Sequence, residues 1–138
     1  MCTFANMKKQ RLHIERELHS SSAPIIWDLI STAHGLSRWL ADDIQEQDNT
    51  LIFTWGNPYD HHETRTATVI ERSKFSVFRM RWNDDTDEDI FMELRMDKND
   101  LTNDYILSIT DFATAEDIDA LSDIWEDNLI RLHHSSGL

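Results

Sequence analysis

Alternating apolar and polar residues predict β-strands along most of the chain. Leu12, Ile14 and Leu18 are separated by polar positions, which is typical of a strand with one buried face. Similar runs lie at residues 51–55, 64–72, 75–82, 90–96 and 105–112. Turn-forming segments such as GNPYD, NDDTDED and DKNDLTND separate these runs. Connections of hairpin length join antiparallel neighbours, so we expect an antiparallel sheet.

The spacing of apolar residues changes to that of a helix in the last part of the chain. One stripe, spaced by three and four residues, consists of Ile118, Leu121, Trp125, Leu129 and Leu132. This stripe predicts a helix over residues 115–134, with Thr114 as its N-cap and Gly137 just past its C-terminal end. The opposite face is expected to contact solvent, because it carries Asp119, Asp123, Glu126 and Asn128.

The segment SAPIIWDLISTAHGLSRWLADD, residues 22–43, predicts two short helices separated by a turn at Gly35. The first covers residues 24–31, where Pro24 suits the first helical turn, and the second lies around residues 36–40. Helices this short are unstable in isolation. We therefore expect Trp27 and Trp39 to be buried between the sheet and the long helix, where they close one end of the space between them.

The predicted order is one strand, two short helices, about six strands and one long helix. This order predicts an α+β fold in which the helices lie on one side of an antiparallel sheet. The sequence has 138 residues, which fits one domain over residues 1–138. Residues 1–7 are expected to form a loose leader, with Met7 as an alternative start to Met1.

This arrangement resembles the START-like, or SRPBCC, superfamily over nearly the whole chain. Within it, the sequence is similar to the small bacterial branch related to the activator of a heat-shock chaperone ATPase. The stretch APIIWDLISTAHGLSRWLAD carries a Trp and then Gly-Leu-x-x-Trp, and WEDNLIRLHHSSG carries a Trp followed by Leu-x-x-Leu. LTNDYILSITDFA resembles the family's final strand, although KNDLTND stands where relatives often have a glycine-rich turn.

The resemblance implies the helix-grip fold, a curved antiparallel sheet of about six to seven strands wrapped around a long C-terminal helix. It also implies a cavity between sheet and helix, which members use to hold lipids, sterols, polyketides or hormones. The candidate lining residues are apolar and share the inner faces: Trp55, Phe78, Met80, Trp82, Met92, Leu94, Leu107, Ile109, Trp125 and Leu129. Met and aromatic side chains make adaptable ligand walls, but the same residues could also fill a solid core.

The charge of the chain restricts its partners. A formal net charge of −13 argues against nucleic acid and against an anionic membrane surface, which both attract Lys and Arg clusters. Ten acidic residues and one basic residue lie between positions 97 and 127, which is typical of a soluble surface and would also suit a protein partner with a basic surface. No apolar run approaches the roughly 20 residues of a membrane-spanning helix. The only cysteine is Cys2, which fits the reducing cytoplasm.

Other polar groups favour structural roles. The basic residues Arg79, Arg81 and Arg95 with Glu93 could bind a carboxylate, but alternation favours a ladder of ion pairs on the outer face of the sheet. NDDTDED lacks the glycine and distal glutamate of an EF-hand loop, and the adjacent pairs His61-His62 and His133-His134 lack a zinc-binding spacing. We therefore expect no metal and no cofactor.

Catalytic motifs are also missing from the sequence. Gly-x-Ser-x-Gly, Walker and Rossmann patterns are absent, and no residue is assigned as catalytic. Tyr59, Tyr105, Asp111 and His34 could meet in a cavity. The sequence thus favours a non-enzymatic domain that binds a small apolar molecule or lipid. The alternatives are a protein-interaction module of the chaperone-activator type and a cyclase-like or hydrolase-like enzyme with a buried titratable pair; the oligomeric state is open.

Overall fold

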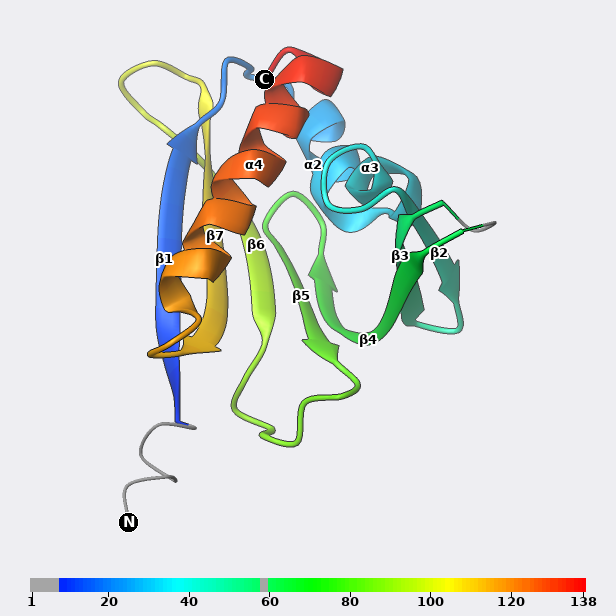
Figure 1. Cartoon of the computed structure of the whole chain (residues 1–138). Coiled ribbons are helices and arrows are strands. Elements are labelled where there is room, and N and C mark those ends of the chain that lie inside the picture. The colour runs from blue at the N-terminus through cyan, green and yellow to red at the C-terminus, as the bar shows by residue number, and fades with distance from the viewer. Residues whose placement is uncertain (1–7, 58–59) are drawn as a thin grey trace.

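The computed structural model describes residues 8–57 and 60–138, so the predicted leader at residues 1–7 and the candidate Tyr59 lie outside the described residues. The described chain forms an α+β fold, as predicted (Figure 1). Its elements are β1 (Lys9–Glu17), α2 (Ala23–Ser31), α3 (Ala33–Ser37), β2 (Asp43–Gln47), β3 (Thr50–Gly56), β4 (His62–Ser73), β5 (Val77–Trp82), β6 (Met92–Lys98), β7 (Tyr105–Thr114) and α4 (Ile118–Ser136).

The described strands form one seven-stranded sheet in the order β1-β7-β6-β5-β4-β3-β2, and every neighbouring pair is antiparallel. Strands β2 to β7 follow one another as a meander, and β1 joins the sheet beside β7, with Ile14 opposite Ile109. The sheet curves, and α4 lies on its concave side (Figure 1). The predicted antiparallel sheet with a long C-terminal helix is therefore confirmed.

Strand β2 is the one described strand that the apolar pattern did not indicate. It lies at the edge of the sheet and pairs only with β3. Ile44 is its single buried residue. An edge strand with one buried position shows no alternation over several residues, so pairing with β3 determines its structure.

Helix α4 begins three residues later than predicted. Thr114 is the last residue of β7, and the N-cap position belongs to Asp117, whose carboxylate accepts a hydrogen bond of 3.3 Å from the Thr114 hydroxyl. The helix ends at Ser136, two residues later than predicted. Gly137 lies just past this end, as predicted, with a left-handed φ of 78° and its N–H donating to the carbonyl of His133 at 2.8 Å. Such a residue is the usual stop signal of a helix.

The apolar stripe of α4 faces the sheet as predicted, since Trp125, Leu129 and Leu132 are buried. The prediction that Asn128 contacts solvent is wrong, because only 5% of this residue is exposed. Asn128 follows Trp125 by three positions, and residues three apart lie on neighbouring positions of one helix face. The acidic residues of the opposite face are not among the buried groups.

Helices α2 and α3 pack beside one another at one end of the sheet (Figure 1). The Thr32 side chain accepts a hydrogen bond from the N–H of Gly35 and so caps α3. Trp39 is fully buried, donates its indole N–H to the carbonyl of Leu29 at 2.9 Å, and places its ring 6.0 Å from that of Trp125. Trp39 is thus buried, as predicted, with its ring beside Trp125 of α4, whereas Trp27 is only partly buried.

The position of α4 leaves part of the concave face uncovered. Its main contacts are with β7 and β1, the two strands at one side of the sheet. Arg16 on β1 strengthens this contact through two hydrogen bonds, of 2.7 and 2.8 Å, to the carboxylate of Glu126. Within the described residues, no helix has the length and apolar character needed to span a membrane.

Candidate functional site

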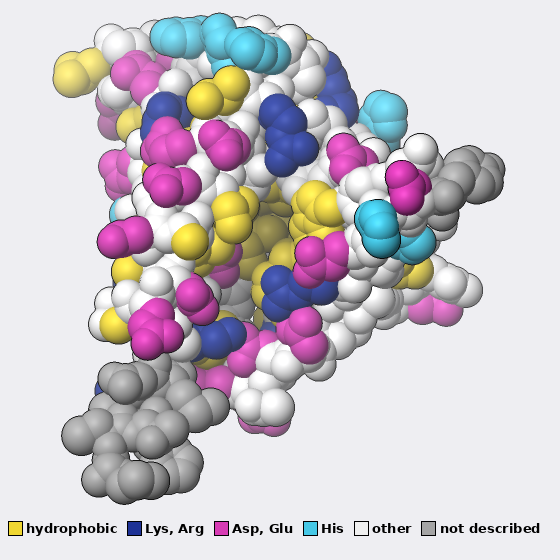
Figure 2. Space-filling model, in the orientation of Figure 1, with side chains coloured by type: hydrophobic (Ala, Val, Ile, Leu, Met, Phe, Trp, Pro, Cys, Tyr) yellow, Lys and Arg dark blue, Asp and Glu magenta, His cyan; other side chains and the backbone are white. Residues whose placement is uncertain are grey.

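A cavity of about 420 Å³ lies between α4 and strands β3, β4 and β5. It opens to the surface, where apolar side chains are seen recessed between the helix and the strands (Figure 2). We call it the central cavity. Its lining residues come from six elements and the α3–β2 connection: Leu40, Phe53, Trp55, Glu63, Arg65, Met80, Trp82, Met92, Asp111, Leu121, Ile124, Trp125, Asp127, Asn128 and Arg131.

Aromatic rings form one wall of the central cavity. Phe53 and Trp55 alternate along β3 and their ring centroids are 5.7 Å apart, while Trp82 on β5 lies 4.8 Å from Phe53. The indole N–H of Trp55 donates to the carbonyl of Leu40 at 2.9 Å. Each ring contacts another and Trp55 is also hydrogen bonded, so the wall is a packed aromatic surface.

Of the ten residues predicted to line a ligand cavity, five border the central cavity: Trp55, Met80, Trp82, Met92 and Trp125. The other five lie in the packed core: Phe78, Leu94, Leu107, Ile109 and Leu129. Met80, Met92 and Trp125 belong to both the cavity lining and this buried core. Neither Trp27 nor Trp39 borders the cavity, and Leu40 is the lining residue next to the short helices.

The sequence pattern did not identify the polar residues of the cavity: Glu63, Arg65, Asp127, Asn128 and Arg131. Charged side chains on strand β4 and helix α4 have the pattern of solvent-facing residues, so no local signal separates them from other surface charges. Phe53 could have been predicted from the sequence, because it shares one face of its strand with Leu51 and Trp55. Leu121 belongs to the predicted stripe of α4, and Ile124 lies beside that stripe at the mouth.

Asp111 is the buried titratable group of the cavity wall among the described residues. Alternation along β7 places it on the inner face with Leu107 and Ile109, a position where apolar residues are usual. Its Oδ2 accepts a hydrogen bond of 2.9 Å from the Trp125 indole, and its Oδ1 accepts one of 2.9 Å from the backbone N–H of Phe112. Burial raises the pKa of Asp111, and these two hydrogen bonds oppose the rise.

We expect the stability of the protein to depend on pH through Asp111. The raised pKa means that Asp111 binds its proton more tightly in the native state than in the unfolded chain, where its pKa is near 3.8. The free energy of unfolding should therefore fall as pH rises from that value through the raised pKa, relative to Asp111→Asn, which does not titrate. Urea unfolding of both proteins at several pH values measures the difference. A flat difference, or one that increases with pH, would contradict the assignment.

Of the catalytic candidates that the structure describes, Asp111 borders the central cavity and Tyr105 and His34 do not. Tyr105 precedes Asp111 by six positions on β7, which is about 20 Å along an extended strand, and His34 belongs to α3. The hydrogen-bond partners of Asp111 are an indole and a backbone N–H, and neither group titrates in the physiological range. Among the described residues that line the central cavity, Asp111 therefore has no titratable hydrogen-bond partner, whereas the enzyme alternative predicts a buried titratable pair there.

The other polar groups have structural partners. Arg79 pairs with Glu93 across β5 and β6 at 2.6 Å, and Arg95 lies 3.7 Å from the same carboxylate. Of these two ion pairs, Arg79–Glu93 joins neighbouring strands, whereas Arg95 lies on the same strand as Glu93. Arg81 donates to the carbonyl of Glu88. In the described residues, no cluster of three or more His, Cys, Asp and Glu side chains has the geometry to hold a metal ion.

Comparison with known proteins identifies a family profile, described as START-like superfamily domain, that matches residues 6–137. A search of the curated proteins found no match. A solved solution structure from Bacteroides fragilis is 38% identical, with a TM-score of 0.62, and the alignment covers 93% of this chain and 91% of that one.

Two more distant solved structures share the fold. The Aha1 dimer from Colwellia psychrerythraea has a TM-score of 0.71 at 14% identity, with 93% of this chain and 98% of that chain covered. CalU16 from Micromonospora echinospora has a TM-score of 0.64 at 15% identity, with 90% and 72% covered. At such identities the likeness concerns the fold alone.

Proposed function

The chain belongs to the START-like superfamily, and on this premise we propose that it binds a small, largely apolar molecule in the central cavity. The observation that carries the proposal is the cavity itself, about 420 Å³ in volume and open to the surface. Ligand sites usually have volumes of roughly 300–1,000 Å³, apolar walls and a few polar groups. The central cavity has this composition, with Trp and Met walls around Asp111 and Asn128.

The shape of the fold explains why this space remains open. Trp55 and Trp82 are both only partly buried, although they contact the core. Filling the space would require α4 to lie closer to β3 and β5, but its packing against β7 and β1 holds it at the other side of the sheet. An apolar ligand that covers these rings would remove more of their surface from water, which is favourable by about 25 cal/mol per Å². We propose that this binding takes place in the cytoplasm, because a chain whose only cysteine is Cys2 suits a reducing compartment.

We expect the purified protein to retain or bind an apolar molecule. Native mass spectrometry before and after organic extraction detects a retained ligand, and titration with 1-decanol, followed by calorimetry, measures binding to the emptied protein. Ile124→Trp places a bulky indole ring at the mouth of the cavity. It should weaken 1-decanol binding about tenfold, which corresponds to about 1.4 kcal/mol.

The matched control is Ile130→Trp. Ile124 and Ile130 both lie on α4 and are 55% and 53% exposed, but only Ile124 borders the central cavity. Ile130→Trp should therefore leave 1-decanol binding unchanged. The proposal is wrong if the protein neither retains an apolar molecule nor binds 1-decanol, or if both substitutions affect binding equally.

A second candidate function is contact with a basic protein through the solvent face of α4. This face carries Asp119, Asp123 and Glu126, with Asp127 at the edge of the cavity, and acidic side chains are frequent along it (Figure 2). Such a surface favours electrostatic steering of a basic partner, which salt weakens. Pull-down experiments at low and high salt test this alternative, and the absence of partners at both salt concentrations would exclude it.

A further inference from the structure

Asp111 lies on the wall of the central cavity with part of its bonding capacity unused. Only 8% of the residue is exposed, and each carboxylate oxygen accepts one hydrogen bond, from Trp125 or from the backbone of Phe112. An ionised carboxylate has roughly four acceptor positions. The contacts within the described chain therefore leave acceptor capacity at the cavity wall.

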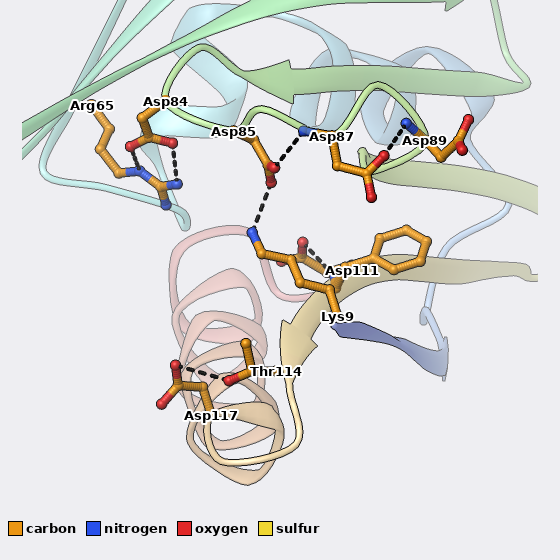
Figure 3. Close-up of polar contacts among 10 residues, drawn as sticks. Lys9, Arg65, Asp84, Asp85, Asp87, Asp89, Asp111, Thr114 and Asp117 are labelled. Atoms are coloured by element: carbon orange, nitrogen blue, oxygen red, sulfur yellow. Dashed lines mark hydrogen bonds and ion pairs between the residues drawn. The ribbon is translucent and has the colours of Figure 1, made fainter. Parts of the chain in front are cut away.

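The basic side chains that act on Asp111 are bound to other carboxylates (Figure 3). Arg65 makes two hydrogen bonds to Asp84, of 2.9 and 2.8 Å. Lys9 makes an ion pair of 2.8 Å with Asp85. Among the described residues, Asp111 takes part in no ion pair. Together with Asp111, this group of interacting residues contains three carboxylates and two cations, of which only Asp111 and Arg65 line the cavity.

The lining of the whole cavity also contains fewer basic groups than carboxylates. Its carboxylates are Glu63, Asp111 and Asp127, and its basic groups are Arg65 and Arg131. Glu63 and Asp127 are exposed and therefore solvated, whereas Asp111 is buried. A buried carboxylate without a cation is unfavourable, because burial removes its hydration without supplying a partner.

The aromatic wall is suited to a positive charge. The guanidinium carbon of Arg65 lies 4.0 Å from the centroid of the Trp82 ring, so this wall already holds one cation against an aromatic face. Trp55 and Trp125 present further indole rings to the same cavity. Cations bind the faces of such rings favourably, and most strongly where water is excluded.

We propose that the ligand of the central cavity is an amphipathic amine, with its ammonium group hydrogen bonded to Asp111 and its apolar body against the Trp and Met walls. This inference rests on the proposed function and specifies its ligand class. An ammonium group has three donors and no acceptor, which complements a carboxylate with unused acceptor positions. It also supplies the missing positive charge at the buried end of the cavity.

The test compares three probes with the same ten-carbon chain: 1-decylamine, 1-decanol and decanoate. Binding to the wild-type protein is measured by calorimetry below the micelle concentrations and at 150 mM salt, where the Debye length is about 8 Å. We expect 1-decylamine to bind at least about tenfold more tightly than 1-decanol, because hydrogen bonds to charged groups are the stronger ones. Decanoate should bind most weakly.

Two single substitutions locate the preference. Asp111→Asn removes the charge but keeps an acceptor for Trp125, so the ratio of the 1-decylamine and 1-decanol affinities should fall close to one. Asp127→Asn removes the same unit of charge from an exposed lining position and should preserve the ratio. Together they separate a contact with Asp111 from general attraction of cations to a chain of net charge −13.

Each outcome has one meaning. Equal binding of 1-decanol and 1-decylamine by the wild-type protein overturns the amine inference and leaves the proposed function intact. Tighter binding of decanoate, or a preference that survives in Asp111→Asn, also overturns it. Binding of none of the probes overturns the proposed function itself. If Asp111→Asn does not fold, the ratio of the 1-decylamine and 1-decanol affinities is compared between the wild-type protein and Asp127→Asn. Loss of the amine preference in Asp127→Asn would assign the preference to this exposed carboxylate and overturn the inference.

Discussion

Replacement of Trp39 by alanine is expected to lower the free energy of unfolding by about 3–5 kcal/mol. The Trp39 side chain is fully buried, and its removal leaves a large void between the short helices and α4. The substitution also removes the hydrogen bond to the carbonyl of Leu29. Because domains are stable by only about 5–15 kcal/mol, the variant should unfold at a much lower urea concentration, as measured by far-ultraviolet circular dichroism.

Trp27→Ala is the control for Trp39→Ala. Trp27 is the other tryptophan of the short helices, but it is only partly buried against the core. The loss of buried apolar surface should therefore be smaller, and so should the decrease in stability. A Trp39→Ala variant that is no less stable than Trp27→Ala would contradict the view that Trp39 anchors the short helices to α4.

Replacement of Gly35 by alanine is the second large effect that we expect. Alanine favours a helix over glycine by about 1 kcal/mol, so propensity alone predicts stabilisation. In the structure, however, a Cβ atom at this position would lie 1.9 Å from the backbone carbonyl oxygen of Asp28. Helices α2 and α3 would have to separate, and we expect a loss of about 3 kcal/mol, the upper part of the range for overpacking.

The matched control is Gly137→Ala, which adds the same methyl group at the end of α4. No heavy atom lies within 4 Å of a Cβ there, but the φ of 78° is left-handed, so the cost should be about 1–2 kcal/mol. Urea unfolding of the two variants measures the comparison. If Gly35→Ala is as stable as the wild-type protein, the two short helices do not approach each other as closely as described.

Local periodicity explains the parts of the fold that were predictable. The spacing of Trp125, Leu129 and Leu132 selects one face of α4, and the alternation of Leu51, Phe53 and Trp55 selects one face of β3. These patterns are visible in the sequence because the buried face of a helix or strand must be mostly apolar, whichever element covers it. The end of α4 at Gly137 was also predictable, because a glycine in the left-handed conformation is a local signal.

The errors arose where packing in the folded chain outweighs the chemical character of a single residue. Thr114 has the chemistry of an N-cap, but pairing with Lys9 of β1 extends β7 through this residue. Asn128 has the chemistry of a surface residue, but it is buried beside the central cavity. For Thr114 the deciding contact joins residues far apart in the chain, and no short window of sequence contains it. Asn128 is buried because it follows Trp125 by three positions on the buried face of α4.

The sequence by itself determined which side chains point to the concave side of the sheet, since that direction follows from periods of two and of about 3.6 residues. Only the tertiary structure decided which of them stay uncovered. Leu107 and Ile109 are sealed in the core, while Trp55 and Trp82 border a cavity. The physical reason is that α4 packs against β7 and β1, so the space over β3 to β5 depends on sheet curvature and helix placement, which are long-range properties of the folded chain.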